Sequence, residues 1–301
     1  MKAEIVSFKA KDNTILDGLI YNYSDVKDTI IISTHGMIGN CFKEREKAIA
    51  RIIQNTNIAL LIYNNRGTGI LTQMKKKDDN KESYFVGGFA SENILDCYYD
   101  IKGAIEFALS HGYKKIFLQG HSLGSTKTVY TYYKLKNEKY EKLDCIKGLI
   151  LLSLLDMPQG IVDVFKYSDE QIRDITNYAY KMKNDEKGDQ LMPEGTFVQP
   201  ITVDEFIRLC LNSDEYNYAK YHDVNYEYKE LNNINIPLFM RWGNNGELIS
   251  QNPKELVEML NNKIKNHNKD FDFIDGANHS FNEFEDILAK QIIEFINKYN
   301  N

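Results

Sequence analysis

The sequence predicts an α/β protein built around a mostly parallel sheet, and three observations support this fold class. Short aliphatic runs recur through the first half of the chain and again near its end. Stretches with helical spacing of apolar residues separate these runs, and this alternation is typical of β-α-β units. The chain has 301 residues, of which 43% are hydrophobic and 27% charged, so it can bury a large core without disulfides or a structural metal.

Strands are predicted where apolar residues alternate with polar ones or run together between turn residues. The first two strands flank Asp12 and Asn13 and should form a hairpin. The later runs are rich in Ile, Leu and Phe, as expected of buried parallel strands. The predicted strands cover residues 4–9, 15–23, 29–33, 58–63, 116–118, 146–152, 237–242 and 270–274.

Helices are predicted where apolar residues recur three or four positions apart. They cover residues 42–54, 94–108, 126–135, 254–260 and 284–296, and Gly112 is a C-cap signal for the second. The charged run 75–79 is expected to be an exposed loop tip. The aromatic residues Tyr84, Phe85 and Phe89 are expected either to line a pocket or to pack in the core.

The pattern changes between residues 156 and 232. This segment holds three of the five prolines and no run that predicts a buried strand, and helix-like stretches lie over 162–183 and 204–212. The strand and helix alternation then resumes. We therefore expect one core made of residues 1–155 and 233–301, with 156–232 as an insertion of mixed helices and loops.

Charge and cysteine content exclude several classes of protein. The net charge of −6 makes the chain a poor candidate for nucleic-acid binding, which needs a basic surface. No apolar run reaches the roughly 18 residues of a membrane helix, and the N-terminus lacks a signal-peptide pattern, so we expect a cytoplasmic protein. The four cysteines are scattered without metal spacing, which predicts reduced thiols and no metal site.

The strongest chemical signal is the G-x-S-x-G string at residues 120–124. It directly follows a predicted strand and precedes a predicted helix, which is the context that a nucleophile elbow requires. In such an elbow Ser122 lies at the tip of a tight turn. The alternative is an ordinary strand-to-helix turn that contains a serine.

A serine hydroxyl needs a general base, and the base needs an acid that orients it. The expected chain order is Ser, acid, His, and His279 follows the last predicted strand. The other histidines fit less well. His111 lies at a helix end, His222 and His267 lie in polar stretches, and His121 lies on the wrong side of the turn.

The acid has two candidates. It should follow the strand at 237–242, where Gly243 is succeeded by two asparagines and Gly246 before Glu247. Asparagine cannot carry the charge that stabilises an imidazolium, whereas Glu247 can. Asp156, just beyond the strand at 146–152, is the alternative acid. If they are not catalytic, Glu247 is a surface carboxylate and Asp156 is a helix N-cap.

An oxyanion hole needs two backbone N–H groups aimed at the developing negative charge. The N–H of Leu123, directly after the candidate nucleophile, can supply one. The loop 35–40 opens with His-Gly at the end of a strand, and the N–H of Met37 is the second expected donor. The turn 64–69 is expected to be structural, with Arg66 bonding to neighbouring loops.

These residues resemble the α/β-hydrolase superfamily over nearly the whole chain. The likeness lies in H-G at 35–36, R-G-x-G at 66–69, G-H-S-L-G at 120–124 and His279 in the expected order. Residues 240–247 and the Gly-Gly pair at 87–88 resemble a subfamily that includes fungal siderophore esterases. The resemblance implies an α/β-hydrolase fold, with an eight-stranded mostly parallel sheet flanked by helices. It also implies that residues 156–232 form a helical cap over the site.

The implied function is a serine hydrolase that cleaves a carboxylic ester, with an amide or thioester as further possible bonds. Acyl transfer or peptide cyclisation through the same acyl-enzyme is the alternative function. A non-catalytic binding protein on a degenerate fold is a third, since Gly246 stands where the superfamily has aspartate. The expected partner is a small acyl substrate, with no cofactor or metal, and the oligomeric state is left open.

Overall fold

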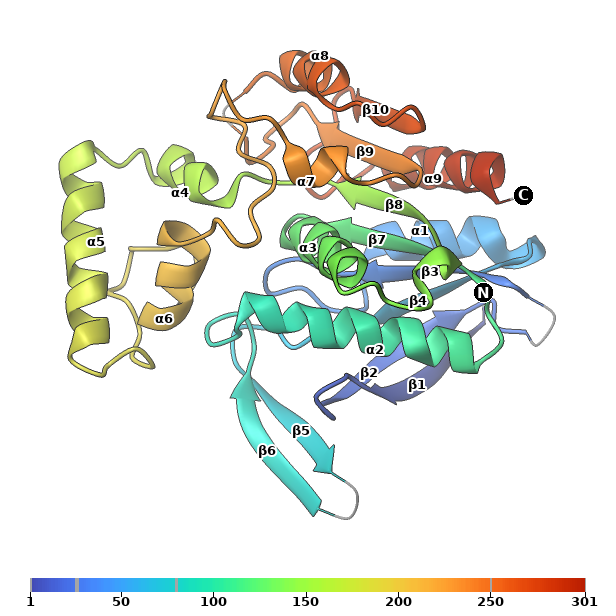
Figure 1. Cartoon of the computed structure of the whole chain (residues 1–301), viewed down its shortest axis with the longest axis horizontal. Helices are drawn as coiled ribbons and strands as arrows, with labels where there is room; N and C mark the ends of the chain where they lie inside the picture. The colour runs from blue at the N-terminus through green and yellow to red at the C-terminus, as the bar shows by residue number, and fades with distance from the viewer. Residues whose placement is uncertain (1, 25–26, 79–80, 250, 301) are drawn as a thin grey trace.

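A single large sheet organises the residues described by the computed structural model, which are 2–24, 27–78, 81–249 and 251–300 (Figure 1). Its strands are β1 (Ala3–Lys9), β2 (Ile15–Tyr21), β3 (Thr29–Thr34), β4 (Ile58–Tyr63), β7 (Lys115–His121), β8 (Ile146–Leu152), β9 (Leu238–Gly243) and β10 (Lys269–Ile274). They lie in the order β1-β2-β4-β3-β7-β8-β9-β10. β2 is antiparallel to both of its neighbours, and all pairs from β4 to β10 are parallel. This confirms the predicted eight-stranded, mostly parallel sheet.

Helices cover both faces of the sheet. One face is covered by α2 (Cys97–Ser110), α3 (Leu123–Asn137) and α8 (Pro253–Lys263), and the other by α1 (Glu44–Ile52) and α9 (Glu285–Tyr299) (Figure 1). Side chains of a strand alternate between the faces, so Ile30 and Ile32 join the first core and Ile31 the second. Because both faces are buried, the central strands are continuous aliphatic runs rather than alternating ones.

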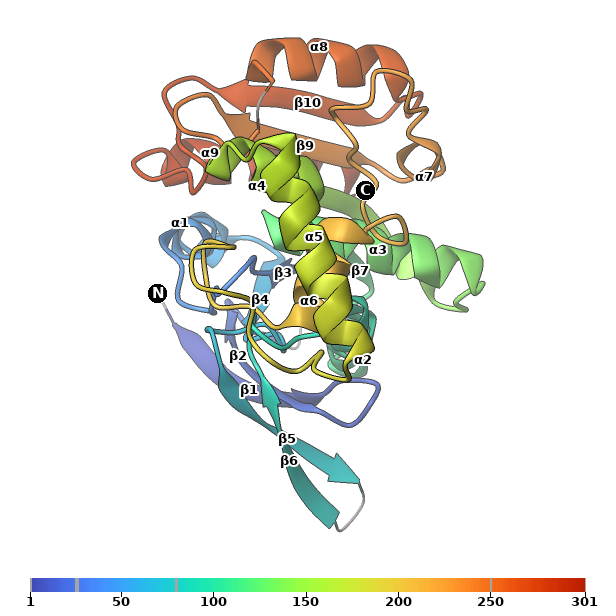
Figure 2. The same cartoon turned by 90° about the vertical axis from the view of Figure 1, so that its left-hand side faces the viewer.

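Residues 156–232 contain several helices. They are α4 (Met157–Phe165), α5 (Asp169–Asn184), α6 (Val203–Phe206) with a π-helical turn over Ile207–Leu211, and α7 (Lys229–Asn232). The single stretch expected over 162–183 is two helices, because Lys166 takes a left-handed conformation with φ +51° and Ser168 caps α5. α4, α5 and α6 stand beyond the carboxyl ends of the parallel strands (Figures 1 and 2).

The charged run at 75–79 is a strand rather than the predicted loop tip. β5 (Thr72–Asp78) pairs antiparallel with β6 (Lys81–Gly87) in a ribbon that projects from the sheet, and Asp79 lies outside the described residues (Figure 1). Tyr84 and Phe85 are exposed on this ribbon, whereas Phe89 just beyond it is buried. Most side chains of the ribbon are exposed or partly exposed.

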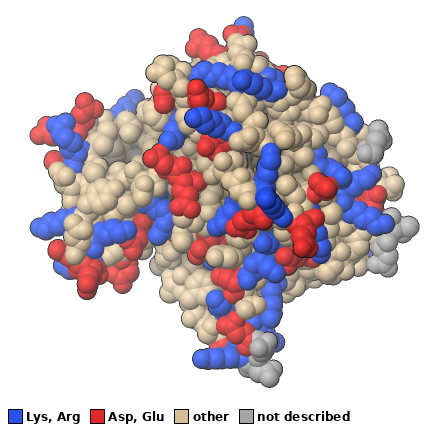
Figure 3. Space-filling view, viewed as in Figure 1, with Lys and Arg blue, Asp and Glu red and all other residues tan. Residues whose placement is uncertain are grey.

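Acidic and basic side chains are interspersed over the face shown in Figure 3. Within the described ranges, no helix combines the length and the apolar character needed to cross a bilayer.

Candidate active site

Ser122 lies in a strained turn between β7 and α3. Its backbone angles are φ +56° and ψ −128°, a conformation that costs a non-glycine residue on the order of 1–3 kcal/mol. A Cβ on Gly120 would lie 2.3 Å from the carbonyl oxygen of Gly124, and one on Gly124 would lie 2.2 Å from that of Thr34. Both glycines of the string are therefore sterically required. The helix begins at Leu123, three residues earlier than predicted, so Ser122 lies at its N-terminus.

The structure pairs His279 with Glu247 across the loops that follow β10 and β9. The Nδ1–H of His279 donates to Glu247 Oε1, and Oε2 accepts from Ser153 Oγ at 2.8 Å and from the Gly243 N–H at 3.0 Å. A carboxylate only accepts hydrogen bonds, so this pair places the proton of a neutral imidazole on Nδ1. The Nε2 atom of His279 is then free to accept a proton.

The Glu247 carboxylate is held in its ionised form. Burial raises its pKa, but the hydrogen bond and charge of His279, with the two donors on Oε2, outweigh burial and lower the pKa below its ordinary value. The lowered pKa means that an anion faces the imidazole at neutral pH. Ser153, which the sequence analysis missed, supplies one of these bonds from the position directly after β8.

Asp156, the alternative acid, is brought to a different histidine. Its Oδ1 accepts from Asn217 Nδ2 at 2.9 Å, and its Oδ2 accepts from His222 Nδ1. No contact joins it to His279 in the described part of the chain. The geometry therefore favours Glu247 as the partner of His279. The contact between Asp156 and His222 spans 66 residues, and no sequence pattern indicates it.

His121 supports the loop that carries His279. Its Nε2–H donates to the backbone carbonyl of His279 at 2.7 Å, and Ser153 Oγ lies 3.2 Å from the same oxygen. Burial and nearby cationic side chains lower the pKa of His121 well below its ordinary value, so the ring stays neutral. The Nε2–H of His121 therefore holds the backbone of His279 in place.

The loop after β3 lies directly against the elbow. A Cβ on Gly36 would come within 2.8 Å of the His121 carbonyl oxygen and 3.0 Å of Ser122 Cβ. Among the described residues, no acceptor is bound to the N–H of Met37 or of Leu123. The first N–H groups of a helix have no intrahelical partner and favour negative charge, which applies to Leu123 at the start of α3.

His35 anchors this loop to the turn at 64–69. Burial lowers the pKa of His35 to about 3, so the ring is neutral. Its Nδ1 lies 2.9 Å from the Gly36 carbonyl oxygen, and its Nε2 accepts from the Asn65 N–H at 3.1 Å. The ring therefore fixes the loop that carries the Met37 N–H.

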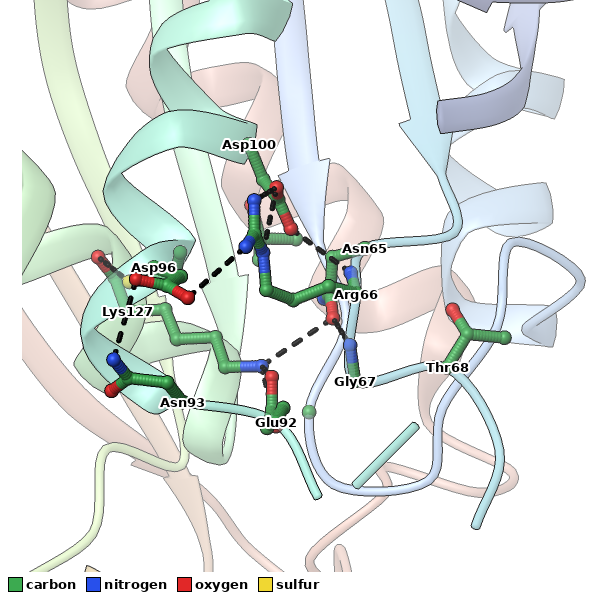
Figure 4. A network of polar contacts seen from close by, with 12 residues as sticks. Asn65, Arg66, Gly67, Thr68, Glu92, Asn93, Asp96, Asp100 and Lys127 are labelled. Atoms are coloured by element: carbon green, nitrogen blue, oxygen red, sulfur yellow. Dashed lines mark hydrogen bonds and ion pairs between the residues drawn. The ribbon is translucent and has the colours of Figure 1, made fainter. Parts of the chain in front are cut away.

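Two buried ionic clusters hold the turn at 64–69 in place (Figure 4). Arg66 binds Asp100 at 2.6 Å and Asp96 at 3.2 Å, which confirms the predicted structural role of Arg66. Lys127 on α3 binds Glu92 at 2.6 Å, with both side chains almost fully buried. The turn is thus fixed from two sides, and His35 connects it to the loop that faces Ser122.

Two cavities meet at Ser122. The smaller one, here called the apolar lobe, measures about 60 Å³ and is lined by Met37, Ser122, Leu123, Leu155, Met157 and Phe197 among others. The larger one, here called the polar lobe, measures about 330 Å³ and is lined by His35, Met37, Arg45, His121, Ser122 and His279 among others. Ser122 and Met37 border both lobes, whereas His279 borders the polar lobe. In the described ranges, no group of three or more His, Cys, Asp or Glu side chains is arranged to hold a metal ion.

Comparisons with known proteins identify the fold. No protein-family model and no curated protein matches the chain. Solved structures do match over nearly its full length. Est1E from Butyrivibrio proteoclasticus with ferulic acid bound has 14% identity, covers 97% of this chain and 98% of its own, and gives a TM-score of 0.65.

Two further solved structures are similar over comparable lengths. The Pyrococcus furiosus esterase Pf2001 has 15% identity over 99% of this chain and 92% of its own, with a TM-score of 0.61. Mouse alpha/beta hydrolase domain-containing protein 10 has 14% identity over 98% and 99%, with a TM-score of 0.60. The chain therefore has the α/β-hydrolase fold, as predicted. The narrower resemblance to siderophore esterases stays a prediction.

Proposed function

We propose that this chain is a serine hydrolase that cleaves carboxylic esters of small molecules through Ser122, His279 and Glu247. The observation that carries the proposal is the pairing of His279 Nδ1 with an ionised Glu247 at the polar lobe that Ser122 also borders. Several similar structures are those of esterases, which supports the same reaction class.

In the first half of the reaction, the Oγ of Ser122 attacks the ester carbonyl carbon. A carbon–oxygen bond forms, and the proton of Oγ passes to Nε2 of His279. The N–H groups of Met37 and Leu123 bind the resulting oxyanion. The bond to the alcohol then breaks, and His279 returns the proton to the leaving alkoxide, which departs as the neutral alcohol.

In the second half, water attacks the acyl-enzyme. His279 removes a proton from the water as its oxygen bonds to the carbonyl carbon, and the same two N–H groups bind the new oxyanion. The bond to Ser122 Oγ then breaks, and His279 returns the proton to that oxygen. The products are a carboxylic acid and the free enzyme.

The carboxylate of Glu247 makes both halves possible. It keeps the proton of the neutral ring on Nδ1, and it faces the positive charge that develops on His279 in each transition state. Glu247 therefore serves where the superfamily pattern has aspartate at the position of Gly246. A carboxylate in contact with the histidine argues against a degenerate, non-catalytic site.

Access of water favours hydrolysis over acyl transfer. The polar lobe is bordered by the exposed residues Lys43, Glu44, Ser280 and Asn282, so bulk solvent reaches the side of Ser122 that His279 faces. An acyltransferase or cyclase must keep water from its acyl-enzyme. The exposed border of this lobe does not do so.

The proposal is tested by measuring hydrolysis of short-chain esters by the full chain and by Ser122→Ala and His279→Gln. Each substitution should reduce kcat/KM at least 10³-fold, because a triad acts as a unit. Equal activity of wild type and Ser122→Ala would overturn the proposal. Thermal unfolding of all three proteins provides the control for folding.

A further inference from the structure

We propose that the apolar lobe binds the acyl group and the polar lobe binds the alcohol, so that the substrates are esters of short apolar acids with larger polar alcohols. This inference rests on the proposed function, which makes Ser122 the nucleophile and His279 the base. It adds an orientation and a size limit that the triad alone does not set.

The orientation follows from the position of His279. The base must return its proton to the leaving alcohol oxygen, so the alcohol has to lie on the side of Ser122 that His279 faces. His279 borders the polar lobe and does not border the apolar lobe. The acyl chain, on the opposite side of the carbonyl carbon, then extends into the apolar lobe.

The size limit follows from the volume of the apolar lobe. Its volume is about 60 Å³, and one water-sized group needs about 10–15 Å³ measured in this way, so the lobe holds roughly four to six carbon atoms. Leu155, Met157 and Phe197 in its lining are buried, whereas Val164, Val198 and Leu248 are exposed, so the lobe is firm on its buried side and open on the other. The Phe197 ring also stacks on fully buried Phe89 with 5.7 Å between ring centroids.

The chemistry of the lining selects apolar acids. The lobe is lined almost entirely by carbon atoms, and the charged side chain in its lining is Asp156. Both carboxylate oxygens of Asp156 already accept hydrogen bonds, from Asn217 and from His222. A charged or strongly polar acyl group would lose its water here without gaining a new partner, which is costly.

The polar lobe suits a larger alcohol with hydroxyl groups. Its volume of about 330 Å³ exceeds the 60 Å³ of the apolar lobe. Hydrogen-bonding groups form part of its lining, including the guanidinium of Arg45 and the exposed side chains of Lys43, Ser280 and Asn282. The alcohol of the substrate can therefore keep its hydroxyl groups hydrogen-bonded in this lobe.

The first test is a series of 4-nitrophenyl esters with acyl chains from acetyl to decanoyl. Each methylene that fits should raise kcat/KM about fourfold, which is the value of burying one CH₂. We expect the rise to stop between butanoyl and hexanoyl and kcat/KM to fall beyond. A maximum at decanoyl would overturn the size limit.

A filling substitution tests which lobe binds the acyl chain. A Cβ on Gly160, which lines the apolar lobe from α4, would meet the Leu248 carbonyl oxygen at 3.5 Å, an ordinary contact. Gly160→Leu therefore adds bulk to the lobe, and leucine favours a helix more than glycine does. We expect the ratio of hexanoyl to acetyl kcat/KM to fall at least tenfold.

Asn282→Leu is the control in the polar lobe, because it keeps the number of side-chain heavy atoms and removes the hydrogen-bonding amide. It should leave the acyl-length profile unchanged and should lower the preference for butanoate esters of glycerol over those of methanol. If Asn282→Leu shortens the acyl profile, or if Gly160→Leu leaves it unchanged, the lobes are assigned wrongly. Failure of the proposed function is distinguishable, because then no ester is hydrolysed in a Ser122-dependent manner.

Discussion

Replacing Glu247 by glutamine should leave the shape of the site intact and reverse the proton pattern on His279. Oε2 of Glu247 accepts from Ser153 Oγ at 2.8 Å and from the Gly243 N–H at 3.0 Å. The amide oxygen of Gln should occupy this position, because an NH₂ group there would face two donors. The amide NH₂ group then takes the position of Oε1 and faces Nδ1 of His279.

This orientation makes Nδ1 the acceptor and forces the proton of the neutral ring onto Nε2. The atom that must accept the proton of Ser122 is then blocked, and the imidazolium loses its facing anion. We expect kcat/KM for a short-chain ester to fall about 10⁴-fold, equivalent to about 5 kcal/mol of transition-state stabilisation. Initial rates of 4-nitrophenyl butanoate hydrolysis measure the loss.

Asp156→Asn is the informative comparison, because Asp156 is the other candidate acid. Its carboxylate contacts Asn217 and His222 instead of His279, so we expect a loss of less than about tenfold. Thermal unfolding shows whether each variant is folded. A loss under tenfold in Glu247→Gln, or a 10⁴-fold loss in Asp156→Asn, would refute the assignment of the acid.

Three further predictions concern stability. Because the pKa of Glu247 is lowered in the folded protein, its anion stabilises the fold at pH values above its ordinary pKa of 4.5. This stabilisation is lost as the pH falls through the lower pKa of the folded state. In urea unfolding, Glu247→Gln should therefore lose less stability than wild type between neutral and acidic pH. Gly124→Ala should lower stability by about 3 kcal/mol or more, because its Cβ would lie 2.2 Å from a carbonyl oxygen. Gly160→Ala in α4, whose Cβ would make only an ordinary contact at 3.5 Å, should raise stability by about 0.5–1 kcal/mol in the same measurement. Lys127→Met leaves the buried Glu92 unpaired and should cost about 3–5 kcal/mol, and the double variant with Glu92→Leu should recover most of that loss; an equal loss in both would contradict the reasoning.

The sheet could be predicted because its strands are buried on both faces. Residues 29–33 and 58–63 are continuous aliphatic runs, and the structure places β3 and β4 there within one residue. The ribbon of β5 and β6 could not be predicted in this way, because most of its side chains are solvated and its apolar residues, such as Tyr84 and Phe85, neither alternate with polar ones nor form a buried run. The break between α4 and α5 depends on the backbone conformation of Lys166, which helical spacing does not reveal.

The candidate site could be located because each of its residues follows a strand. Ser122, Glu247 and His279 come after β7, β9 and β10, and parallel strands bring their carboxyl ends to one edge. The polar pairs around the site could not be predicted. The pairs formed by Asp156 with His222 and by Lys127 with Glu92 join distant segments through side-chain packing, and no local pattern records such contacts.

Covalent labelling tests the central claim, an activated Ser122, most directly. The full chain is treated with a fluorophosphonate probe and examined by intact-mass spectrometry beside Ser122→Ala. Activation of Ser122 by His279 predicts one adduct on wild type and none on the variant. Folded wild-type protein that takes up no probe, or an adduct that persists in Ser122→Ala, would contradict it.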